Sequence, residues 1–418
     1  MRTAIHPSAI VAGDEMDILK NAYILIDDKR IAEIAKGKPA RVDRTVDCRG
    51  CVILPGLINT HVHVGDSAFK DAWFDKTLNK LFKPPEGLKH VLLKSTPKNV
   101  LVESIRDTLT DMIRTGTTTM ADFREGGVEG IDIFHAAGQG LKIRSLAFGR
   151  PEYAFSEEQL QLNSGTFRKE ILLSVEKFLE LADGLGLSGA NELTDDALKQ
   201  LSKIAQEHGK FKAIHVAEHP ESREISKRRT GLTEVERSVR HFNPNLLVHL
   251  IYAIDEELKL VADRRVAVAC CPRANATLRL RLPKIAKMLD SGIDVAFGTD
   301  NVMLCSPDMW REMEFTSKAY CISPQAERRL EPREILKMAT INGAKALRIH
   351  KVTGSLVEGK LADLVAVDFH DANLRNTYDV ILALTNRARP DNVRLTMIEG
   401  EVAYDRDSKL QRTAPKTA

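Results

Sequence analysis

The sequence lacks the features that mark several large classes of protein. It has no excess charge of one sign, because 61 Lys and Arg stand against 58 Asp and Glu, and this excludes a bulk basic surface for nucleic acid or anionic membrane. No apolar run reaches the roughly 20 residues of a membrane-spanning helix, and the N-terminus does not resemble a signal peptide. Six cysteines in 418 residues, without a regular framework, favour reduced thiols and a cytoplasmic location. We therefore expect a compact small-molecule ligand.

The pattern of apolar residues changes twice along the chain. Up to about residue 55 the chain consists of short β-type runs such as "AYILIDDKRIAEIA", and the tail after about residue 352 returns to them. Between these ends, brief apolar runs alternate with amphipathic stretches such as "TDDALKQLSKIAQEHG". About eight such units predict an α/β fold with a (β/α)8 barrel. We predict a barrel over 56–352 and a small composite β-sandwich built from 1–55 and 353–418.

Several predicted barrel strands end in a side chain that can bind a metal or transfer a proton. In "GLINTHVHVG", His61 and His63 lie two residues apart and so face the same side of a strand. His215, His249 and Asp300 follow near the ends of later strands. Barrel enzymes place their sites at these carboxyl ends. Three histidines and one aspartate can bind zinc or ferrous iron and leave one position for water.

Taken together, the motifs of this chain resemble those of the amidohydrolase superfamily, in its cytosine deaminase, chlorohydrolase and adenosylhomocysteine deaminase-like branch. The resemblance covers nearly the whole chain, from the N-terminal flank to the C-terminal one, and implies a (β/α)8 barrel with a composite β-sandwich. The motifs that carry it are "PGLINTHVH", "TGTTTMAD", "HVAEH", "LVHLIYAIDEEL", "CCPRANATLRL", "FGTDN" and "GSLVEGKLADLVAVD".

This resemblance also implies a role for each chemical group. Glu218 would be the proton shuttle, His249 would stand near the attacking water, and Asp300 would accept the proton of that water besides binding metal. The metal ligands that it implies are His61, His63, His215 and Asp300.

The number of metal ions follows from an absence. Two-metal branches of the superfamily use a carboxylated lysine on the fourth strand, whereas the corresponding stretch here, "ADGLGLSGANELTDDAL", contains no lysine. We therefore expect a single divalent ion. Zinc is the expected metal, with iron or manganese as alternatives because the same ligands serve all three.

The substrate-binding stretches depart from the relatives. Adenosylhomocysteine deaminase-like proteins carry a "PHSPY"-type segment where this chain reads "LSGANEL", which argues against a thioether nucleoside. A long segment, "GDSAFKDAWFDKTLNKLFKPPEGLKHVLL", follows the first strand; its aromatic residues either stack on a flat ring or form a packing helix at the barrel mouth. The candidate substrate contacts are Trp73 in this segment, Arg124 and Glu125 in "DFREGG", Arg150 in "FGRPEY", and Asn301. For the two arginines and Glu125, a surface or interface charge is the alternative interpretation.

The prediction is a metal-dependent aminohydrolase that removes an exocyclic amine from a nitrogen heterocycle of the pyrimidine, purine or pterin type. Hydrolysis of a cyclic amide or of a carbon–chlorine bond on the same site is the alternative, and a non-enzymatic metal-binding protein is a third possibility that the complete set of catalytic residues disfavours. We expect no nucleic-acid or membrane partner. The resemblance implies a homo-oligomer.

Overall fold

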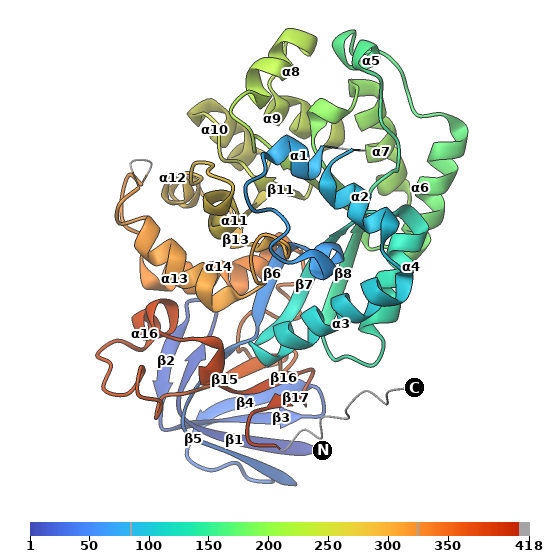
Figure 1. Ribbon diagram of the computed structural model, residues 1–418. Helices are drawn as coiled ribbons and strands as arrows, with labels where there is room; N and C mark the ends of the chain where they lie inside the picture. The colour runs from blue at the N-terminus through green and yellow to red at the C-terminus, as the bar shows by residue number, and fades with distance from the viewer. Residues whose placement is uncertain (84–85, 324–325, 409–418) are drawn as a thin grey trace.

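The computed structural model describes residues 1–83, 86–323 and 326–408, and its centre is a parallel barrel (Figure 1). The chain enters the barrel at β6, directly after the long strand β5, and the neighbouring strands then follow in chain order. The barrel strands are β6 (Leu57–His63), β7 (Thr117–Arg124), β8 (Arg144–Gly149), β9 (Gly184–Leu187), β10 (Phe211–Val216), β11 (Leu246–His249), β12 (Ala267–Cys270), β13 (Val295–Phe297) and β14 (Asp300–Asn301).

The barrel closes where its last strand meets its first. β14 continues β13 after a break of two residues, so that β13 and β14 together occupy the eighth strand position. β14 pairs in parallel with β6, with Asp300 opposite Val62 and Asn301 opposite His63. This closure confirms the predicted (β/α)8 barrel.

Most helices lie between successive barrel strands, as the alternating pattern predicts, and those after residue 308 follow the last barrel strand. Their bounds are η1 (Val64–Phe69), α1 (Leu78–Phe82), α2 (Leu88–Ser95), α3 (Lys98–Arg114), α4 (Gly127–Gly138), α5 (Glu157–Gln161), α6 (Lys169–Leu181), η2 (Ala190–Glu192), α7 (Asp195–Glu207), α8 (Ser222–Thr230), α9 (Glu234–Arg237), η3 (Ser238–Phe242), α10 (Asp255–Asp263), α11 (Pro272–Thr277), α12 (Ile285–Asp290), α13 (Met309–Ala319), α14 (Pro332–Met338), α15 (Ile341–Ala346), α16 (Val380–Asn386) and η4 (Pro390–Asn392).

α7 shows how the sequence specifies such a helix. The hydroxyl oxygen of Thr194 accepts a hydrogen bond from the backbone N–H of Ala197 and caps the first turn. The buried residues Leu198, Leu201 and Ile204 recur at helical spacing and face the barrel. No helix within the described ranges combines the length and the apolar character that crossing a membrane requires.

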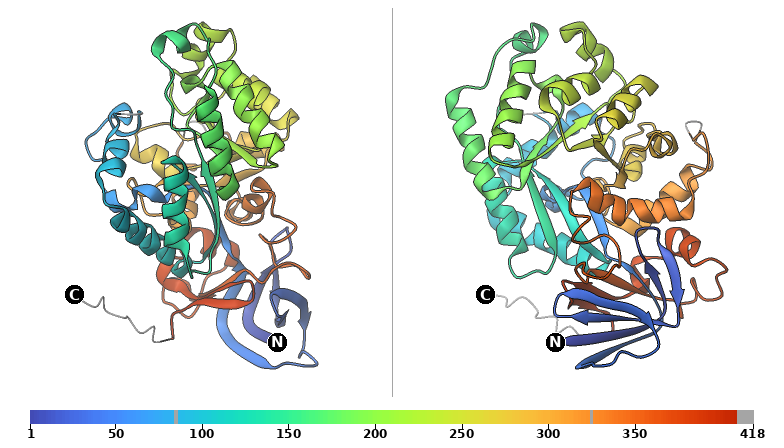
Figure 2. Two further views of the ribbon diagram at one scale, coloured as in Figure 1. Left: turned by 90° about the vertical axis from the view of Figure 1, so that its right-hand side faces the viewer. Right: turned by 180° about the vertical axis from the view of Figure 1, so that it is seen from behind.

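A second sheet joins the two ends of the chain below the barrel (Figures 1 and 2). Seven of its strands hydrogen-bond in the order β17-β16-β15-β5-β1-β3-β4, β2 pairs with β1 outside this order, and all pairs are antiparallel except β1 with β5. The sheet has its own apolar core, which includes Ile5, Ile24 and Leu364. The division at residues 55/56 and 352/353 stays a prediction. The strands are β1 (Arg2–Ala12), β2 (Asp17–Lys20), β3 (Ala22–Asp27), β4 (Arg30–Lys36), β5 (Arg44–Pro55), β15 (Leu364–Asp368), β16 (Val393–Ile398) and β17 (Glu401–Asp405).

The long segment after β6 folds into η1, α1 and α2, which lie at the end of the barrel away from the terminal sheet (Figure 1). This is the end at which β6 and its parallel neighbours finish. Pro84 and Pro85 of the segment lie outside the described residues. The segment therefore covers the face on which the candidate site residues lie.

Candidate metal centre and active site

Four barrel strands deliver the predicted metal and proton-transfer groups to one place. His61 and His63 come from β6, His215 from β10, His249 from the end of β11, and Asp300 from β14. Two of these residues have left-handed backbones, with φ of 74° at His249 and 62° at Asp300. Such conformations are unfavourable for residues other than glycine, and they are typical of functional sites that the surrounding fold over-determines.

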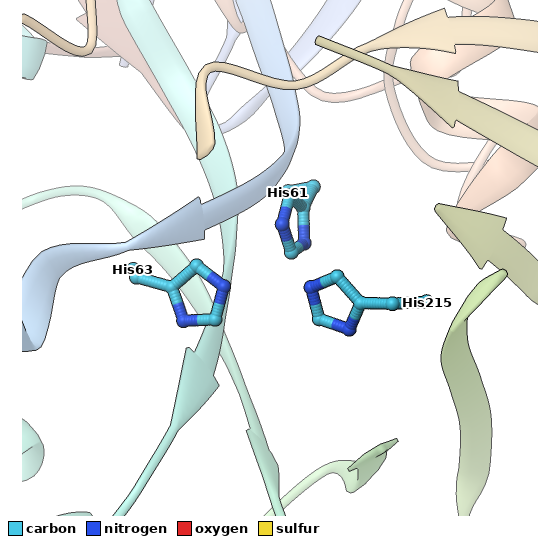
Figure 3. A group of neighbouring side chains, drawn as sticks. All are labelled: His61, His63 and His215. Atoms are coloured by element: carbon cyan, nitrogen blue, oxygen red, sulfur yellow. The ribbon is translucent and has the colours of Figure 1, made fainter. Parts of the chain in front are cut away.

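The imidazole rings lie close together inside the barrel mouth. The centroid of the His61 ring is 4.9 Å from that of His63, 4.8 Å from that of His215 and 5.8 Å from that of His249. Figure 3 shows the rings of His61, His63 and His215 converging on one point. Potential ligand atoms lie within 4.8 Å of one another in two overlapping groups, one made by these three histidines and one by His61, His249 and Asp300.

Backbone carbonyls orient two of these rings. Nδ1 of His63 lies 2.9 Å from the carbonyl oxygen of Phe123, and Nδ1 of His215 lies 2.8 Å from that of Leu187. A carbonyl only accepts, so each Nδ1 carries the proton and donates it. The lone pair of each histidine is therefore on Nε2, the arrangement that a metal-binding histidine uses.

The charge states of the cluster also fit a cation. Burial lowers the pKa of His61, His215 and His249, and lowers that of His63 to about 4, so the imidazoles are uncharged at neutral pH. Burial opposes ionisation of Asp300 as well, but the neighbouring histidines hold its pKa well below the ordinary value. Four neutral nitrogen donors thus surround one carboxylate.

His61 provides the test of whether these residues suit a metal. Its side chain has 0% exposure, and neither ring nitrogen has a well-formed hydrogen bond to any described residue. Buried polar atoms are almost always satisfied, so a buried imidazole without a hydrogen bond, placed among other donor atoms, suits a metal ligand. The residues present fit a divalent metal.

The position of the His61 ring depends on Phe123 and on the space that a glycine leaves for Phe123. The ring of Phe123 packs edge-on against His61, with centroids 4.2 Å apart. A side chain at Gly186 in β9 would place its Cβ only 2.7 Å from Cδ1 of Phe123. Gly186 therefore leaves the space that Phe123 needs in order to support His61.

Glu218 lies beside the cluster on the loop that follows β10. One of its carboxylate oxygens, Oε1, is 3.8 Å from Nε2 of His249. Burial raises the pKa of Glu218 to about 7, and the nearby His219 only partly opposes this. A carboxyl group that titrates near neutrality can both donate and accept a proton, as a general acid–base catalyst must.

These observations are matched by comparisons with known proteins. The profile of the Amidohydrolase family matches residues 52–403. The chain belongs to this family. It is 36% identical to a putative aminohydrolase of Methanothermobacter thermautotrophicus, over 95% of this chain and 98% of that protein. It is 30% identical to a 5'-deoxyadenosine deaminase of Methanosarcina acetivorans, over 94% of this chain and 89% of that protein. A zinc complex of atrazine chlorohydrolase from Arthrobacter aurescens shares the fold, with a TM-score of 0.84, 24% identity and 98% coverage of both chains.

This amidohydrolase carries a buried charged network on the side of the cluster where β7 ends. Glu125 lies 3.3 Å from Nδ1 of His63 through Oε1, and the same oxygen is 2.6 Å from Nζ of Lys89. Arg124 Nε is 2.9 Å from Oδ2 of Asp122. Burial alone would raise the pKa of Glu125, but Lys89, His63 and Arg124 together bring it well below the ordinary value. Arg124 and Glu125 are therefore not surface charges.

The other predicted substrate contacts have different surroundings. The guanidinium of Arg150 contacts the hydroxyl of Ser188. Asn301 is nearly buried, and its side-chain amide donates to Oδ1 of Asp300 at 2.8 Å. Trp73 is partly buried against the main apolar core, whereas Phe74 is 74% exposed. Substrate binding by any of these residues stays a prediction.

Sequence reasoning missed three members of the charged network, Asp66, Lys89 and Asp122. Lys89 stands in the apolar stretch "GLKHVLL", and a charged residue in such a run is the one signal that the sequence contains. Asp122 accepts a hydrogen bond from the backbone N–H of Val64 at 2.8 Å. Asp66 accepts one from the backbone N–H of Met303 at 3.0 Å. Their roles depend on segments far apart in the sequence.

Proposed function

We propose that this amidohydrolase is a mononuclear, metal-dependent deaminase that removes an exocyclic amine from a nitrogen heterocycle. The observation that carries the proposal is that four buried histidines and Asp300 form two overlapping groups of potential ligands beside Glu218, a carboxyl whose pKa of about 7 suits proton transfer. The relatives named as 5'-deoxyadenosine deaminases support an adenine-type ring as the first substrate class to test.

The ligands of the metal would be His61, His63, His215 and Asp300. The single ion is supported by β9, the fourth barrel strand, whose sequence Gly184–Leu187 offers no lysine for carboxylation. Zinc is supported by the imidazole-rich donor set and by the zinc complex of the structurally similar chlorohydrolase. When bound, such an ion lowers the pKa of a coordinated water and so supplies hydroxide at neutral pH.

The remaining steps belong to the protein's own carboxylates and imidazole. Asp300 accepts the proton of the attacking water. Glu218, protonated near pH 7, donates its proton to the ring nitrogen as water adds to the carbon that bears the amine. The carboxylate of Glu218 then takes the proton of the new hydroxyl group and passes it to the amine, which leaves as ammonia when the C–N bond breaks, and the proton held by Asp300 restores Glu218. His249, which is 1% exposed and adjacent to Glu218, stabilises the oxygen that develops at the same carbon.

For substrate recognition we propose Arg150 and Trp73. Arg150 contacts Ser188 in "LSGANEL", the stretch that differs from the deaminase-like relatives. The indole Nε1 of Trp73 is buried and has no hydrogen-bond partner in the described part of the chain. Both groups therefore have donors to offer to a polar ring edge.

The direct test is elemental analysis of the purified protein followed by an ammonia-release assay. Substrates should include 5'-deoxyadenosine, adenosine, guanine, cytosine, an aminopterin ring and a chlorinated triazine. The expected result is about one divalent ion per chain and ammonia release from one ring class. A metal-loaded protein that releases only chloride, opens a cyclic amide, or is silent on all the rings would contradict the proposal.

We propose two further properties, the location of the protein and its oligomeric state. The six cysteines, with no disulfide among those that the structure describes, suit a cytoplasmic location, and the family resemblance suggests a homo-oligomer. Light scattering of the purified protein would measure its oligomeric state. Fractionation of the source cells would test the location.

A further inference from the structure

Lys89 is a buried cation next to the metal centre that the mechanism does not use. It lies on α2, in the segment that covers the barrel mouth, and its side chain is only 3% exposed. A lysine in such a place is costly unless its ammonium group is fully paired. The partners of Lys89 therefore indicate what it does.

The ammonium group of Lys89 contacts two residues that each touch a proposed metal ligand. Nζ is 2.6 Å from Oε1 of Glu125, which is itself 3.3 Å from Nδ1 of His63. Nζ is also 2.8 Å from Oδ1 of Asn301, whose amide donates to Oδ1 of Asp300 at 2.8 Å. Lys89 is thus connected to two proposed ligands, each through a single intervening residue.

The position of these contacts in the barrel adds to the argument. Glu125 directly follows β7 and Asn301 ends β14, and these two strands flank β6, which carries His61 and His63. A third contact, 3.8 Å from Nζ to Oδ2 of Asp66, ties Lys89 to η1 directly after β6. Lys89 therefore joins the ends of three adjacent strands around the His-X-His pair.

We propose that Lys89 is a positioning residue that holds Glu125 and Asn301 so that His63 and Asp300 are preorganised for the metal. The proposal rests on the proposed metal-dependent function and deepens it. Residues that contact the metal-binding side chains restrict the rotamers of those side chains. Loss of such a contact commonly lowers metal affinity about 10- to 100-fold. α2 would then be part of the metal centre as well as its cover.

A simple charge effect predicts the opposite sign, and this makes the proposal testable. Lys89 is a positive charge near the cation, so its removal would strengthen metal binding if charge repulsion were all that mattered. Its removal weakens binding if it holds the ligands in place. The sign of the change in affinity separates the two explanations.

The experiment compares the zinc affinity of wild type, Lys89→Met and Lys94→Met by chelator competition. Lys94 lies on the same helix and is exposed, so Lys94→Met is the matched control. We expect Lys89→Met to bind zinc about 10- to 100-fold more weakly, with an altered visible spectrum of the cobalt-substituted protein, and Lys94→Met to match wild type. Equal or tighter binding by Lys89→Met would overturn the proposal.

A second variant keeps the test decisive if the unpaired Glu125 destabilises Lys89→Met. The double variant Lys89→Met/Glu125→Gln removes the buried ion pair as a unit and leaves no lone charge of that pair. If the two residues act together, its loss of zinc affinity should be no greater than that of the weaker-binding single variant. Additive losses would contradict a shared role. A wild-type protein that binds no metal would instead refute the proposed function.

Discussion

Glu125 and Glu218 flank the same histidines in opposite electrostatic settings. On the β7 side, Glu125 is paired with Lys89 and His63, and its pKa lies well below the ordinary value. On the β10 side, burial raises the pKa of Glu218 to about 7, and its one ion-pair contact among the described residues is His249 at 3.8 Å. The comparison teaches that similar carboxyl groups acquire different tasks from their neighbours. A permanently charged Glu125 can orient a ligand, and Glu218 can exchange protons.

The largest effect should come from the residue that both sides share. Asp300→Ala removes a proposed ligand and the acceptor of the water's proton, so we expect metal content near zero and at least a thousandfold loss of kcat/KM. Metal analysis and the deaminase assay measure both. Asp294→Asn, which changes an exposed residue directly before β13, is the control. Full metal content in Asp300→Ala would show that Asp300 is not a ligand.

On the proton-transfer side, Glu218→Gln should retain the metal and lose turnover. The amide keeps the shape of the side chain but cannot exchange a proton, and a lost acid–base group lowers kcat by about 10²- to 10⁴-fold. Glu221 is exposed and follows Glu218 in the sequence, so Glu221→Gln should behave as wild type. Retained kcat in Glu218→Gln would remove the proposed difference between the two carboxyl groups.

In contrast to Glu218→Gln, Glu125→Gln should weaken metal binding and largely retain turnover. We expect zinc affinity to fall about 10- to 100-fold because His63 loses a charged partner, while kcat at saturating zinc remains within about tenfold of wild type. The exposed Glu129→Gln on α4 is the control for this variant. The comparison would fail if Glu125→Gln kept its zinc and lost its turnover as Glu218→Gln is expected to do.

The smallest effect concerns Glu234, which supports the loop that carries Glu218. Its carboxylate accepts a hydrogen bond from the backbone N–H of Ala217 at 2.8 Å, and burial raises its pKa from 4.5 to about 7. The folded state therefore favours the protonated form. This contribution to stability, at most about 3 kcal/mol, is complete below pH 4.5 and is lost as the pH rises through 7.

Glu234→Gln should make stability less dependent on pH. We expect the melting temperature of the variant to rise relative to that of wild type between pH 5 and pH 8, as measured by thermal unfolding at each pH. Glu207→Gln, which is exposed on α7, should show a constant difference from wild type. A constant difference for Glu234→Gln as well would show that its carboxyl does not titrate in this range.

The sequence allowed the spatial grouping of these side chains to be predicted, because each stands in a short local motif; that they bind a metal stays a prediction. His61 and His63 need only the two-residue period of a strand to face one way, and the strand order of a closed barrel brings His215 and Asp300 to them. β9 is harder to recognise, since its four residues, "GLGL", have no strand propensity. Gly186 leaves space for Phe123 and Phe148, and Gly184 lies against Phe211, so both glycines reflect packing against other strands.

The charged network around Glu125 could not be predicted from the sequence, because its contacts also come from other parts of the chain. Arg124 ends β7 and Glu125 directly follows it, so both have the sequence pattern of surface charges. Their burial results from the placement of α2, which brings Lys89 across a segment of more than twenty residues to Glu125 and Asn301. No periodic pattern encodes how deeply such a helix end reaches.

The closure of the barrel has a consequence for how the enzyme is made. β14 meets β6 through only two residue pairs, and Asp300 and His63 belong to them. An ion shared by His63 and Asp300 therefore cross-links the first and last strands of the barrel, as a disulfide would in a secreted protein. During synthesis, more than two hundred residues are added to the chain between His63 and Asp300. If the proposed ion binds there, it would hold the finished barrel closed, and we expect its removal to make the contact between β14 and β6 the first place to open.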